Sequence, residues 1–288
     1  MSLVLENVTY RYSQGTAYEI TALNHVNLSI GDGEFIGIIG HTGSGKSTLV
    51  QHLNGLLKAT EGAIYFNGEN IYQEKYDLRG LRTQVGMVFQ YPEHQLFEET
   101  VLKDISFGPS NMGLEPAEIE KRARDAAKFV GLREELLEKS PFELSGGEKR
   151  RVAIAGVIAM RPRVLILDEP MAGLDPGGCE GILRNITDYR RETGSTVLFV
   201  THSMDDAARI ADRLIVFHDG GIAMDGTPEE VFSHAQELTE MGLDVPQPAA
   251  IAAELRRRGA ALPESIYTSE QLHAAALAWL RKGGSAGC

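Results

Sequence analysis

Lys46 and Ser47 close a glycine-rich octapeptide whose residue types could hold the phosphates of a nucleotide. The octapeptide GHTGSGKS spans residues 40–47 and matches the spacing G-x-x-x-x-G-K-S without a gap. Glycines let backbone N–H groups turn inward around a phosphate, because no Cβ stands in the way. The lysine adds a positive charge across the β- and γ-phosphates, and the serine hydroxyl can complete the shell of a Mg2+ ion. A chance match in a glycine-rich turn is the alternative for the motif taken alone.

Asp168 and Glu169 form a second candidate, because two adjacent carboxylates end an apolar run at residues 164–167. A short apolar run favours a buried strand. Carboxylates at the C-terminal edge of a parallel strand point into the crevice where α/β folds bind ligands. There Asp168 could hold Mg2+ through water, and Glu169 could orient or deprotonate the water that attacks a γ-phosphate. A helix N-cap pair is the alternative. It explains Asp168, but it does not explain why Asp168 occurs in the same chain as a phosphate loop.

Ser145, Gly146 and Gly147 form a third candidate, just ahead of an apolar helical stretch at residues 152–160. A hydroxyl and free N–H groups at a helix start can bind an anion. Taken alone, these residues also fit an ordinary N-cap with a glycine turn. They gain weight from their place in the chain, between the phosphate loop and the two carboxylates.

In this order the three motifs resemble those of the ATP-binding-cassette (ABC) ATPases, with residues 144–148 as the signature motif. The resemblance implies roles for further residues. Gln90 would be the glutamine of the Q-loop, and residues 172–175 would be the D-loop. His202 would be the switch histidine, and Tyr12 the aromatic residue that stacks on adenine.

The site implied by this resemblance binds ATP and Mg2+. The predicted catalytic residues are Glu169, His202 and Gln90, and the predicted Mg2+ ligands are Ser47, Gln90 and Asp168. The predicted nucleotide-binding residues are Tyr12, Gly40, His41, Thr42, Gly43, Ser44, Gly45, Lys46, Ser47, Thr48, Ser145, Gly146, Gly147 and Glu148. In this family two cassettes sandwich two nucleotides, since the signature motif of one chain closes over ATP held by the other.

Longer segments narrow the resemblance. Residues 89–101 and 150–157 look similar to the energy-coupling factor (ECF) vitamin transporters, which carry two different ATPase subunits. Residues 168–176 and 241–247 are similar to the second, or A-prime, ATPase of those complexes. The resemblance predicts an ATP-hydrolysing subunit of an ECF importer that powers membrane uptake of vitamins or related micronutrients. The alternatives are the ATPase of a cobalt or nickel importer and a soluble ABC ATPase without a transport role.

Two residues depart from the family pattern. Glu148 replaces the common glutamine of the signature motif, and Met171 stands where threonine is usual. The substitution at Met171 leaves the catalytic groups in place and changes one contact beside the predicted catalytic glutamate.

The implied partners are a second ATPase subunit or another copy of this chain, a transmembrane coupling subunit and a substrate-binding membrane subunit. The chain would then be a peripheral protein on the cytoplasmic face of the cell membrane. Glu93, Glu98 and Glu99 cluster just beyond Gln90. We expect this acidic segment to meet basic helices of the transmembrane subunit, and a solvated charged loop is the alternative.

Composition argues against several classes of function. The formal net charge is −12, which is poorly suited to nucleic-acid phosphates, so no nucleic-acid partner is predicted. No run approaches the roughly 20 apolar residues that span a bilayer, and the first residues lack the basic start of a secretory signal. We therefore expect other chains to supply any membrane path. Cys179 and Cys288 fit a reducing compartment and suggest neither a disulfide framework nor a zinc site.

The elements that must position these motifs follow from the spacing of apolar residues. Alternation over residues 3–30 predicts antiparallel strands. Residues 33–90 read as a strand, the phosphate loop, its helix (47–57) and a further strand. With the resemblance, the pattern predicts an α/β P-loop NTPase of the ABC nucleotide-binding type. Its parts are an antiparallel β subdomain, a RecA-like core and a helical subdomain over about residues 91–160.

The composition shifts after about residue 234, where two alanine-rich helical stretches cover residues 249–258 and 269–281. We predict an ABC ATP-binding domain at residues 1–233 and a small α-helical dimerisation or regulatory appendage at residues 234–288. Three arginines at residues 256–258 end the first of these helices. They favour the helix dipole or a partner's acidic surface over nucleic acid.

Overall fold

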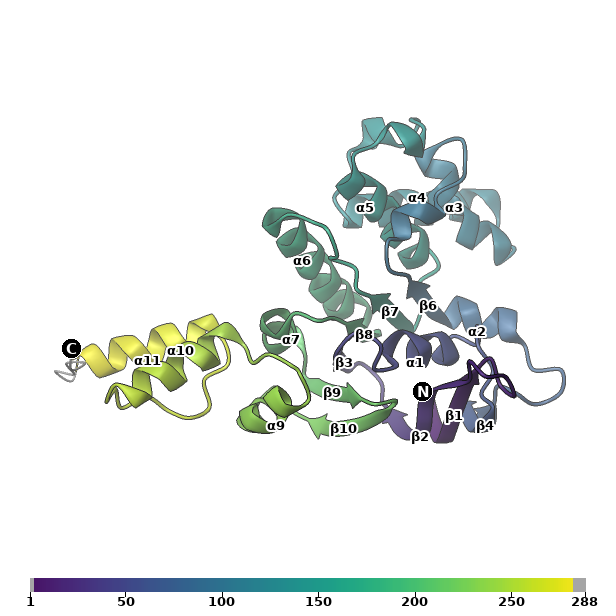
Figure 1. The fold of residues 1–288 in the computed structure, drawn as a ribbon. Coiled ribbons are helices and arrows are strands. Elements are labelled where there is room, and N and C mark those ends of the chain that lie inside the picture. Colours follow the sequence, from purple (N-terminus) through teal and green to yellow (C-terminus); the bar gives the residue numbers. More distant parts are fainter. Residues whose placement is uncertain (1–2, 282–288) are drawn as a thin grey trace.

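The computed structural model describes residues 3–281, so Cys288 and the glycine-rich end of the chain lie outside the described residues. Two sheets form the scaffold (Figure 1). One has four antiparallel strands in the order β2-β1-β4-β5, and the other has six strands in the order β10-β9-β3-β8-β7-β6. The strands are β1 (Leu3–Tyr12), β2 (Ile20–Ile30), β3 (Phe35–Ile39), β4 (Glu61–Phe66), β5 (Glu69–Asn70), β6 (Val85–Val88), β7 (Val164–Asp168), β8 (Thr196–Val200), β9 (Arg213–His218) and β10 (Gly221–Gly226).

The six-stranded sheet is parallel except for β10, which pairs antiparallel with β9. Strands β3, β6, β7 and β8 are buried along their whole length. This burial on both faces explains why they read in the sequence as continuous apolar runs. Their last residues are Ile39, Val88, Asp168 and Val200. Because parallel strands end on one edge of a sheet, the segments that follow these four residues meet there.

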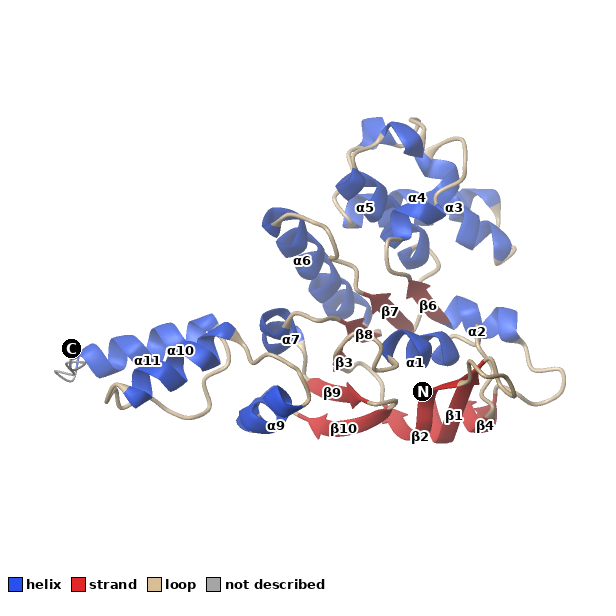
Figure 2. Cartoon of the chain, viewed as in Figure 1, coloured by secondary structure: helices blue, strands red, loops and turns tan. Residues whose placement is uncertain are grey.

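Helices lie on the six-stranded sheet and also form a separate helical group, as predicted for a helical subdomain. Helices α3, α4 and α5 pack against one another in a group to one side of the sheets, and α5 also contacts β6 (Figures 1 and 2). The helices up to residue 233 are α1 (Lys46–Leu53), α2 (Leu78–Gln84), η1 (Pro92–Gln95), α3 (Val101–Asn111), α4 (Pro116–Phe129), η2 (Glu134–Leu136), η3 (Pro141–Glu143), α5 (Gly146–Ile158), α6 (Pro176–Thr193), α7 (Met204–Ile210) and α8 (Pro228–Ser233).

The C-terminal part of the described chain holds three further helices: α9 (Ala235–Glu240), α10 (Gln247–Arg257) and α11 (Ser269–Arg281). Leu238 of α9 packs with β9 and α8, whereas α10 and α11 share a small separate core around Ala252 and Ile266. In Figure 1 the pair projects away from the sheets. Glu254 binds the side chains of Arg257 and Arg258 at 2.6 and 2.7 Å, so two of the three arginines are paired within their own helix.

The predicted phosphate-loop helix over residues 47–57 is shorter in the structure. Helix α1 ends at Leu53, and Gly55 takes a left-handed φ of 70° just beyond it. Glycine adopts that conformation without a Cβ penalty, which ends the helix at this point. Within residues 3–281, none of the helices combines the length and the apolar character needed to cross a membrane.

Candidate nucleotide site

Four buried strands deliver the phosphate loop and the predicted catalytic and Mg2+-binding residues to one edge of the six-stranded sheet. The phosphate loop follows β3, and Lys46 is the first residue of α1. Asp168 ends β7, and Glu169 follows it. Gln90 lies two residues after β6, and His202 lies two residues after β8. The sheet topology therefore brings together residues that are far apart in the sequence.

The phosphate loop is built around backbone conformations that favour glycine. Gly43 and Gly45 have φ angles of 84° and 110°. A Cβ added at Gly45 would lie 2.4 Å from the carbonyl oxygen of Ala22, so a side chain there would clash with backbone. No side chain caps the start of α1. Its first N–H groups are thus left to an external acceptor, which for a nucleotide would be a phosphate.

Lys46 is buried and its ammonium group lies among carbonyl oxygens. Its Nζ donates to the carbonyl oxygens of Gly40 and His41 at 2.7 and 2.9 Å. Burial lowers the pKa of Lys46, while the nearby carboxylates of Glu169 and Asp168 act in the opposite direction. A phosphate would offer the ammonium group a charged acceptor in place of two neutral ones, and hydrogen bonds to charged groups are the stronger kind.

Asp168 is 3% exposed and has one carboxylate oxygen without a partner among the described residues. The hydroxyl of Ser47 lies near this carboxylate. Burial raises the pKa of Asp168, and the hydroxyl of Ser47 and the charge of Lys46 counteract it. An unpartnered buried oxygen beside a hydroxyl fits Mg2+, which prefers oxygen ligands and keeps several waters.

Glu169 is the point where the predicted catalytic groups meet. Gln90 donates from Nε2 to Oε2 of Glu169 at 2.9 Å, and Nδ1 of His202 lies 3.7 Å from the same oxygen. Glu169 has a left-handed φ of 48°, and its backbone N–H donates to Val200 at 3.0 Å. Such strain in a non-glycine residue is typical of functional sites. A cavity of about 430 Å³ beside these residues leaves room for a reacting group.

Tyr12, the predicted adenine-stacking residue, lies beside the start of α1. Its hydroxyl hydrogen-bonds to Oγ1 of Thr48 at 3.2 Å, and the ring of Tyr10 packs edge-on against it with centroids 4.8 Å apart. The Tyr12 ring is 39% exposed and so has a face available to solvent. These contacts place it next to the phosphate loop, and its stacking on adenine stays a prediction.

The signature residues do not join this cluster. Ser145 caps the start of α5 in the helical group, away from α1 (Figure 1). Oε2 of Glu148 accepts from the N–H of Ser145 at 3.0 Å, and Oγ of Ser145 accepts from the N–H of Glu148 at 3.3 Å, which makes a capping box; the Ser145 hydroxyl also donates to Oε2 of Glu148 at 2.7 Å. These hydrogen bonds from Ser145 lower the pKa of Glu148. The N-cap alternative is therefore realised here, and Gly146 and Gly147 form the first turn of the helix.

Arg150 is a residue near the site that sequence reasoning missed. Its guanidinium is buried and donates from Nη2 and Nε to the two carboxylate oxygens of Glu93, at 2.7 and 3.1 Å. It also donates from Nη1 to the carbonyl oxygen of Ala172 at 2.6 Å. This side chain thereby ties α5 to the segment after Gln90 and to the turn after Glu169. In the sequence Arg150 is one of three adjacent basic residues, at the start of the segment 150–157 that resembles the ECF transporters, and nothing there marks it as buried.

The predicted acidic contact surface is wrong for Glu93, because that carboxylate faces inward. Its side chain is 16% exposed. Burial alone would raise the pKa of Glu93, but the hydrogen bonds from Arg150 outweigh it and hold the pKa below its usual range. Glu99 pairs with Lys103 at 2.5 Å on the surface. Two large apolar side chains nearby, Phe97 and Phe107, are also exposed.

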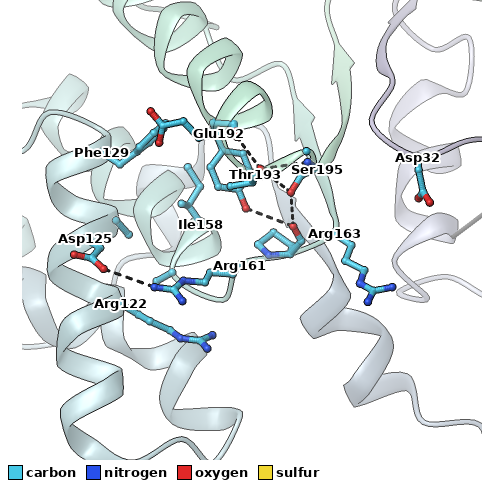
Figure 3. Close-up of a pocket in the computed structure, with 15 residues that line it drawn as sticks. Asp32, Arg122, Asp125, Phe129, Ile158, Arg161, Arg163, Glu192, Thr193 and Ser195 are labelled. Atoms are coloured by element: carbon cyan, nitrogen blue, oxygen red, sulfur yellow. Dashed lines mark hydrogen bonds and ion pairs between the residues drawn. The ribbon is translucent and has the colours of Figure 1, made fainter.

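A second cavity, of about 550 Å³, lies between the helical group and the end of α6 and contains none of the predicted site residues (Figure 3). Its polar groups largely bind one another. The Ser195 hydroxyl donates to the carbonyl oxygen of Pro162 at 2.9 Å, and Arg161 lies 3.6 Å from Asp125. This cavity therefore shares no residue with the predicted site at the sheet edge.

Comparisons with known proteins identify the family that the chain resembles. Residues 23–172 match the ABC transporter family. A protein from Caldanaerobacter subterraneus subsp. tengcongensis named "Energy-coupling factor transporter ATP-binding protein EcfA2" is 54% identical, over 98% of each chain. Among solved structures, cbiO1 from Clostridium perfringens, described as part of the ABC transporter complex cbiONQ, has a TM-score of 0.72 and 41% identity, covering 83% of this chain and 94% of that one. The dimeric post-hydrolysis cassette MJ0796, bound to ADP and Pi, has a TM-score of 0.71 and 33% identity over 78% of this chain and 98% of its own.

Proposed function

This chain belongs to the ABC transporter family and, within it, to the energy-coupling factor transporter ATP-binding proteins, and we propose that it is the A-prime ATPase of an importer for vitamins or related micronutrients. The observation that carries the proposal is the convergence of Gln90 and His202 on Glu169, beside Lys46 and Asp168. That arrangement can position ATP, a water molecule and a general base. The membrane subunits would hold the chain on the cytoplasmic face as a peripheral protein.

The chemistry is mostly positioning and charge stabilisation, as in other phosphoryl transfers. Lys46 and the loop amides would hold the β- and γ-phosphates, and His202 would contact the γ-phosphate. Glu169 would orient or deprotonate the attacking water, and Gln90 fixes the direction of its carboxylate. Ser47, Gln90 and Asp168 would hold Mg2+, which supplies neutralisation of phosphate charge when bound.

A second cassette is needed to complete this site. Ser145 and its neighbours lie on the helical group, so they would close over ATP held by another chain. The dimeric structure of the related cassette MJ0796 supports such pairing. We propose that the partner is the other ATPase of the importer, with a second copy of this chain as the alternative. The exposed Ile251 and Leu280 on α10 and α11 support a role of the appendage in this dimerisation.

The transmembrane coupling subunit would dock in a groove between the helical group and the core. This groove, of about 640 Å³, is lined by Leu56, Phe97 and Phe107, with Arg79 and Arg82 among its polar residues. The two phenylalanine rings meet edge-on with centroids 5.0 Å apart and are more than 45% exposed. An amphipathic helix of the coupling subunit, with an apolar face and acidic flanks, fits this surface better than the basic helix expected from the sequence.

Phe107→Glu tests this docking surface. We expect the variant to keep ATP binding but to lose co-purification with the coupling subunit, because a charge would face the apolar helix. Phe107→Leu keeps the surface apolar and serves as the matched control. Retained co-purification and transport in Phe107→Glu would contradict the proposed groove.

The ATPase of a cobalt or nickel importer, the alternative expected from the sequence, is the second candidate. Cargo specificity would belong to the substrate-binding membrane subunit. Pull-down from membranes followed by identification of that subunit would separate the two candidates. A metal-binding membrane subunit would favour the second, and a vitamin-binding one the first.

ATP hydrolysis by the chain alone, and then mixed with the other ATPase and the coupling subunit, tests the main proposal. We expect strong activity only in the mixture and its loss in Glu169→Gln, which keeps the shape of the side chain but not the base. Full activity of the chain alone would contradict the heterodimer. Activity that survives Glu169→Gln would contradict the role of this glutamate.

A further inference from the structure

Three potential metal ligands meet at the back of the phosphate loop, outside the catalytic cluster. His41 is the second residue of the loop, His218 ends β9, and Asp219 begins the turn to β10. One ligand atom from each lies within 4.8 Å of the others. Nε2 of His41 is 3.9 Å from Oδ1 of Asp219, and Nε2 of His218 is 3.4 Å from Oδ2.

The tautomer of His41 is set by a hydrogen bond to the backbone. Its Nδ1 lies 2.9 Å from the carbonyl oxygen of Thr42, and a carbonyl can only accept, so Nδ1 carries the proton. Nε2 then presents a lone pair toward Asp219. Histidines that bind metals characteristically donate their other N–H in this way, which fixes the ring and raises its basicity as a ligand.

His218 and Asp219 contact each other, but the hydrogen-bonding capacity of the His218 ring is only partly used. Nδ1 of His218 is buried and has no hydrogen-bond partner among the described residues. The two histidine rings pack edge-on with centroids 5.3 Å apart. Asp219 takes a left-handed φ of 46°, and its side chain is 80% exposed, so solvent reaches the cluster. An entry path for an ion is therefore present.

We propose that His41, His218 and Asp219 bind one divalent transition-metal ion of the Zn2+, Co2+ or Ni2+ kind. Two imidazoles and a carboxylate suit these ions, and water would complete the shell. Ligand bonds of about 2.0–2.2 Å put tetrahedral ligands about 3.3–3.6 Å apart. The separations of 3.4 and 3.9 Å from Asp219, and a spacing of at most 4.8 Å among the three ligand atoms, require side-chain movements to reach that geometry.

The bound ion links the phosphate loop to the β9–β10 turn. The two segments already share a backbone bond, from the N–H of Gly220 to the carbonyl oxygen of Ser44 at 3.0 Å. The ion adds a second connection at His41, whose own carbonyl accepts from Lys46. Metal binding therefore restrains the first half of the loop. This role is separate from the Mg2+ that accompanies ATP, and it does not depend on the transporter to which the chain belongs.

Titration of the full chain, without an affinity tag and without nucleotide, tests the site. Isothermal calorimetry with Zn2+ should give one ion per chain, and Co2+ should give the visible absorption of a four- or five-coordinate site. His218→Ala should weaken binding more than about tenfold. Asp219→Asn should weaken it too, and this exposed position tolerates the change without unfolding. His234→Ala is the matched control, because His234 pairs with Glu237 at 2.8 Å but lacks a third ligand.

Two further measurements report whether the bound ion restrains the phosphate loop. Zn2+ should raise the melting temperature of the wild type and of His234→Ala, but not of His218→Ala. It should also slow amide hydrogen exchange in residues 40–45. No saturable binding, or equal binding in His218→Ala and His234→Ala, would overturn the proposal. Binding that leaves hydrogen exchange in the loop unchanged would overturn the link to the phosphate loop.

Discussion

The phosphate-loop side and the signature side of the proposed ATP site differ in how their polar groups are satisfied. On the loop side, Oγ of Ser44 and Oδ1 of Asp168 are buried without a partner in the described part of the chain, and Lys46 reaches only carbonyls. On the signature side, Ser145 and Glu148 satisfy each other in a capping box. One side has polar groups available for a ligand, and the other side is closed on itself.

This difference indicates that the loop side binds ATP within one chain, whereas the signature side takes part only when two chains pair. An unsatisfied buried polar group costs about 1–3 kcal/mol, so the loop side gains from a ligand that supplies the missing partners. The signature side already has its hydrogen bonds, so Ser145 must exchange Glu148 for a phosphate when the partner chain approaches. The loop side is therefore organised for ATP within one chain, whereas the signature side becomes a ligand site only in the pair.

The largest expected effect comes from removing the charge of the loop side. Lys46→Ala should weaken ATP binding by the isolated chain by about 2–5 kcal/mol, the usual cost of losing a buried charged partner. Equilibrium titration with a fluorescent ATP analogue measures this. Lys128→Ala, at an exposed position of α4, should bind as the wild type does. Nearly unchanged binding in Lys46→Ala would remove the distinction between the two sides.

The next effect concerns the connection between the sides. Arg150→Ala leaves the carboxylate of Glu93 without its partner and should lower the free energy of unfolding by about 3 kcal/mol. Hydrolysis should fall as well, because the carbonyl oxygen of Ala172 near Glu169 loses its donor. Arg150→Lys keeps the charge but loses the two-pronged bond, so its effect should be smaller.

Urea unfolding of Arg150→Ala and Arg150→Lys measures the loss of unfolding free energy in each variant. A loss below about 1 kcal/mol in Arg150→Ala would place this buried pair among ordinary surface ion pairs. The two sides of the site would then be less firmly connected than the contacts of Arg150 indicate.

The loop side could be predicted from the sequence because its residues follow buried strands directly. Lys46, Asp168 and Glu169 each lie within a few residues of an apolar run, and parallel strands end on a common edge. Gln90 and His202 required the family resemblance, since a lone glutamine or histidine after a strand carries little signal. The structure then brought both of them to Glu169.

The signature side was harder to predict because its contacts are between distant segments. Arg150 and Glu93 are 57 residues apart, and their bond depends on how α5 packs beside the segment after Gln90. From the sequence alone, Glu93 was therefore predicted to be exposed together with Glu98 and Glu99. The capping box is different, since Ser145 and Glu148 fit the local pattern S-x-x-E of a helix start.

A smaller effect is expected when Glu148 loses its charge. Glu148→Gln keeps an acceptor for the N–H and hydroxyl of Ser145, so the free energy of unfolding should change by less than about 0.5 kcal/mol. In the ATPase pair, the variant lacks the negative charge of Glu148, which would repel the phosphates of the partner's ATP. Hydrolysis should rise about fivefold, the equivalent of ~1 kcal/mol between two charges in a well-solvated site.

Glu138→Gln, at an exposed position of the same helical group, is the control for this charge removal. Steady-state hydrolysis by the reconstituted pair compares the two variants. Equal rates in Glu148→Gln and Glu138→Gln would mean that the signature carboxylate does not face the partner's nucleotide.

The smallest effect is a pH dependence that tells the two sides apart. On the loop side, His52 of α1 is fully buried, and burial lowers its pKa although a bond to the carbonyl oxygen of Thr48 acts against the shift. Between the folded pKa and the unfolded value near 6.5, the unfolded chain binds more protons, so stability falls as pH decreases through that window. Glu148 has a lowered pKa, so its contribution is present above its unfolded pKa and is lost only at lower pH.

Urea unfolding of the wild type and of His52→Leu between about pH 7.5 and about pH 5.5 isolates the contribution of the loop side. The wild type should lose stability across this range with a slope of at most about 1.4 kcal/mol per pH unit from this group. His52→Leu has nothing to protonate there, so its slope should be shallower, while Glu148→Gln should follow the wild type. If Glu148→Gln instead removed the pH dependence of the unfolding free energy, the group that titrates in this range would lie on the signature side. The pH ranges assigned to His52 and Glu148 would then be reversed.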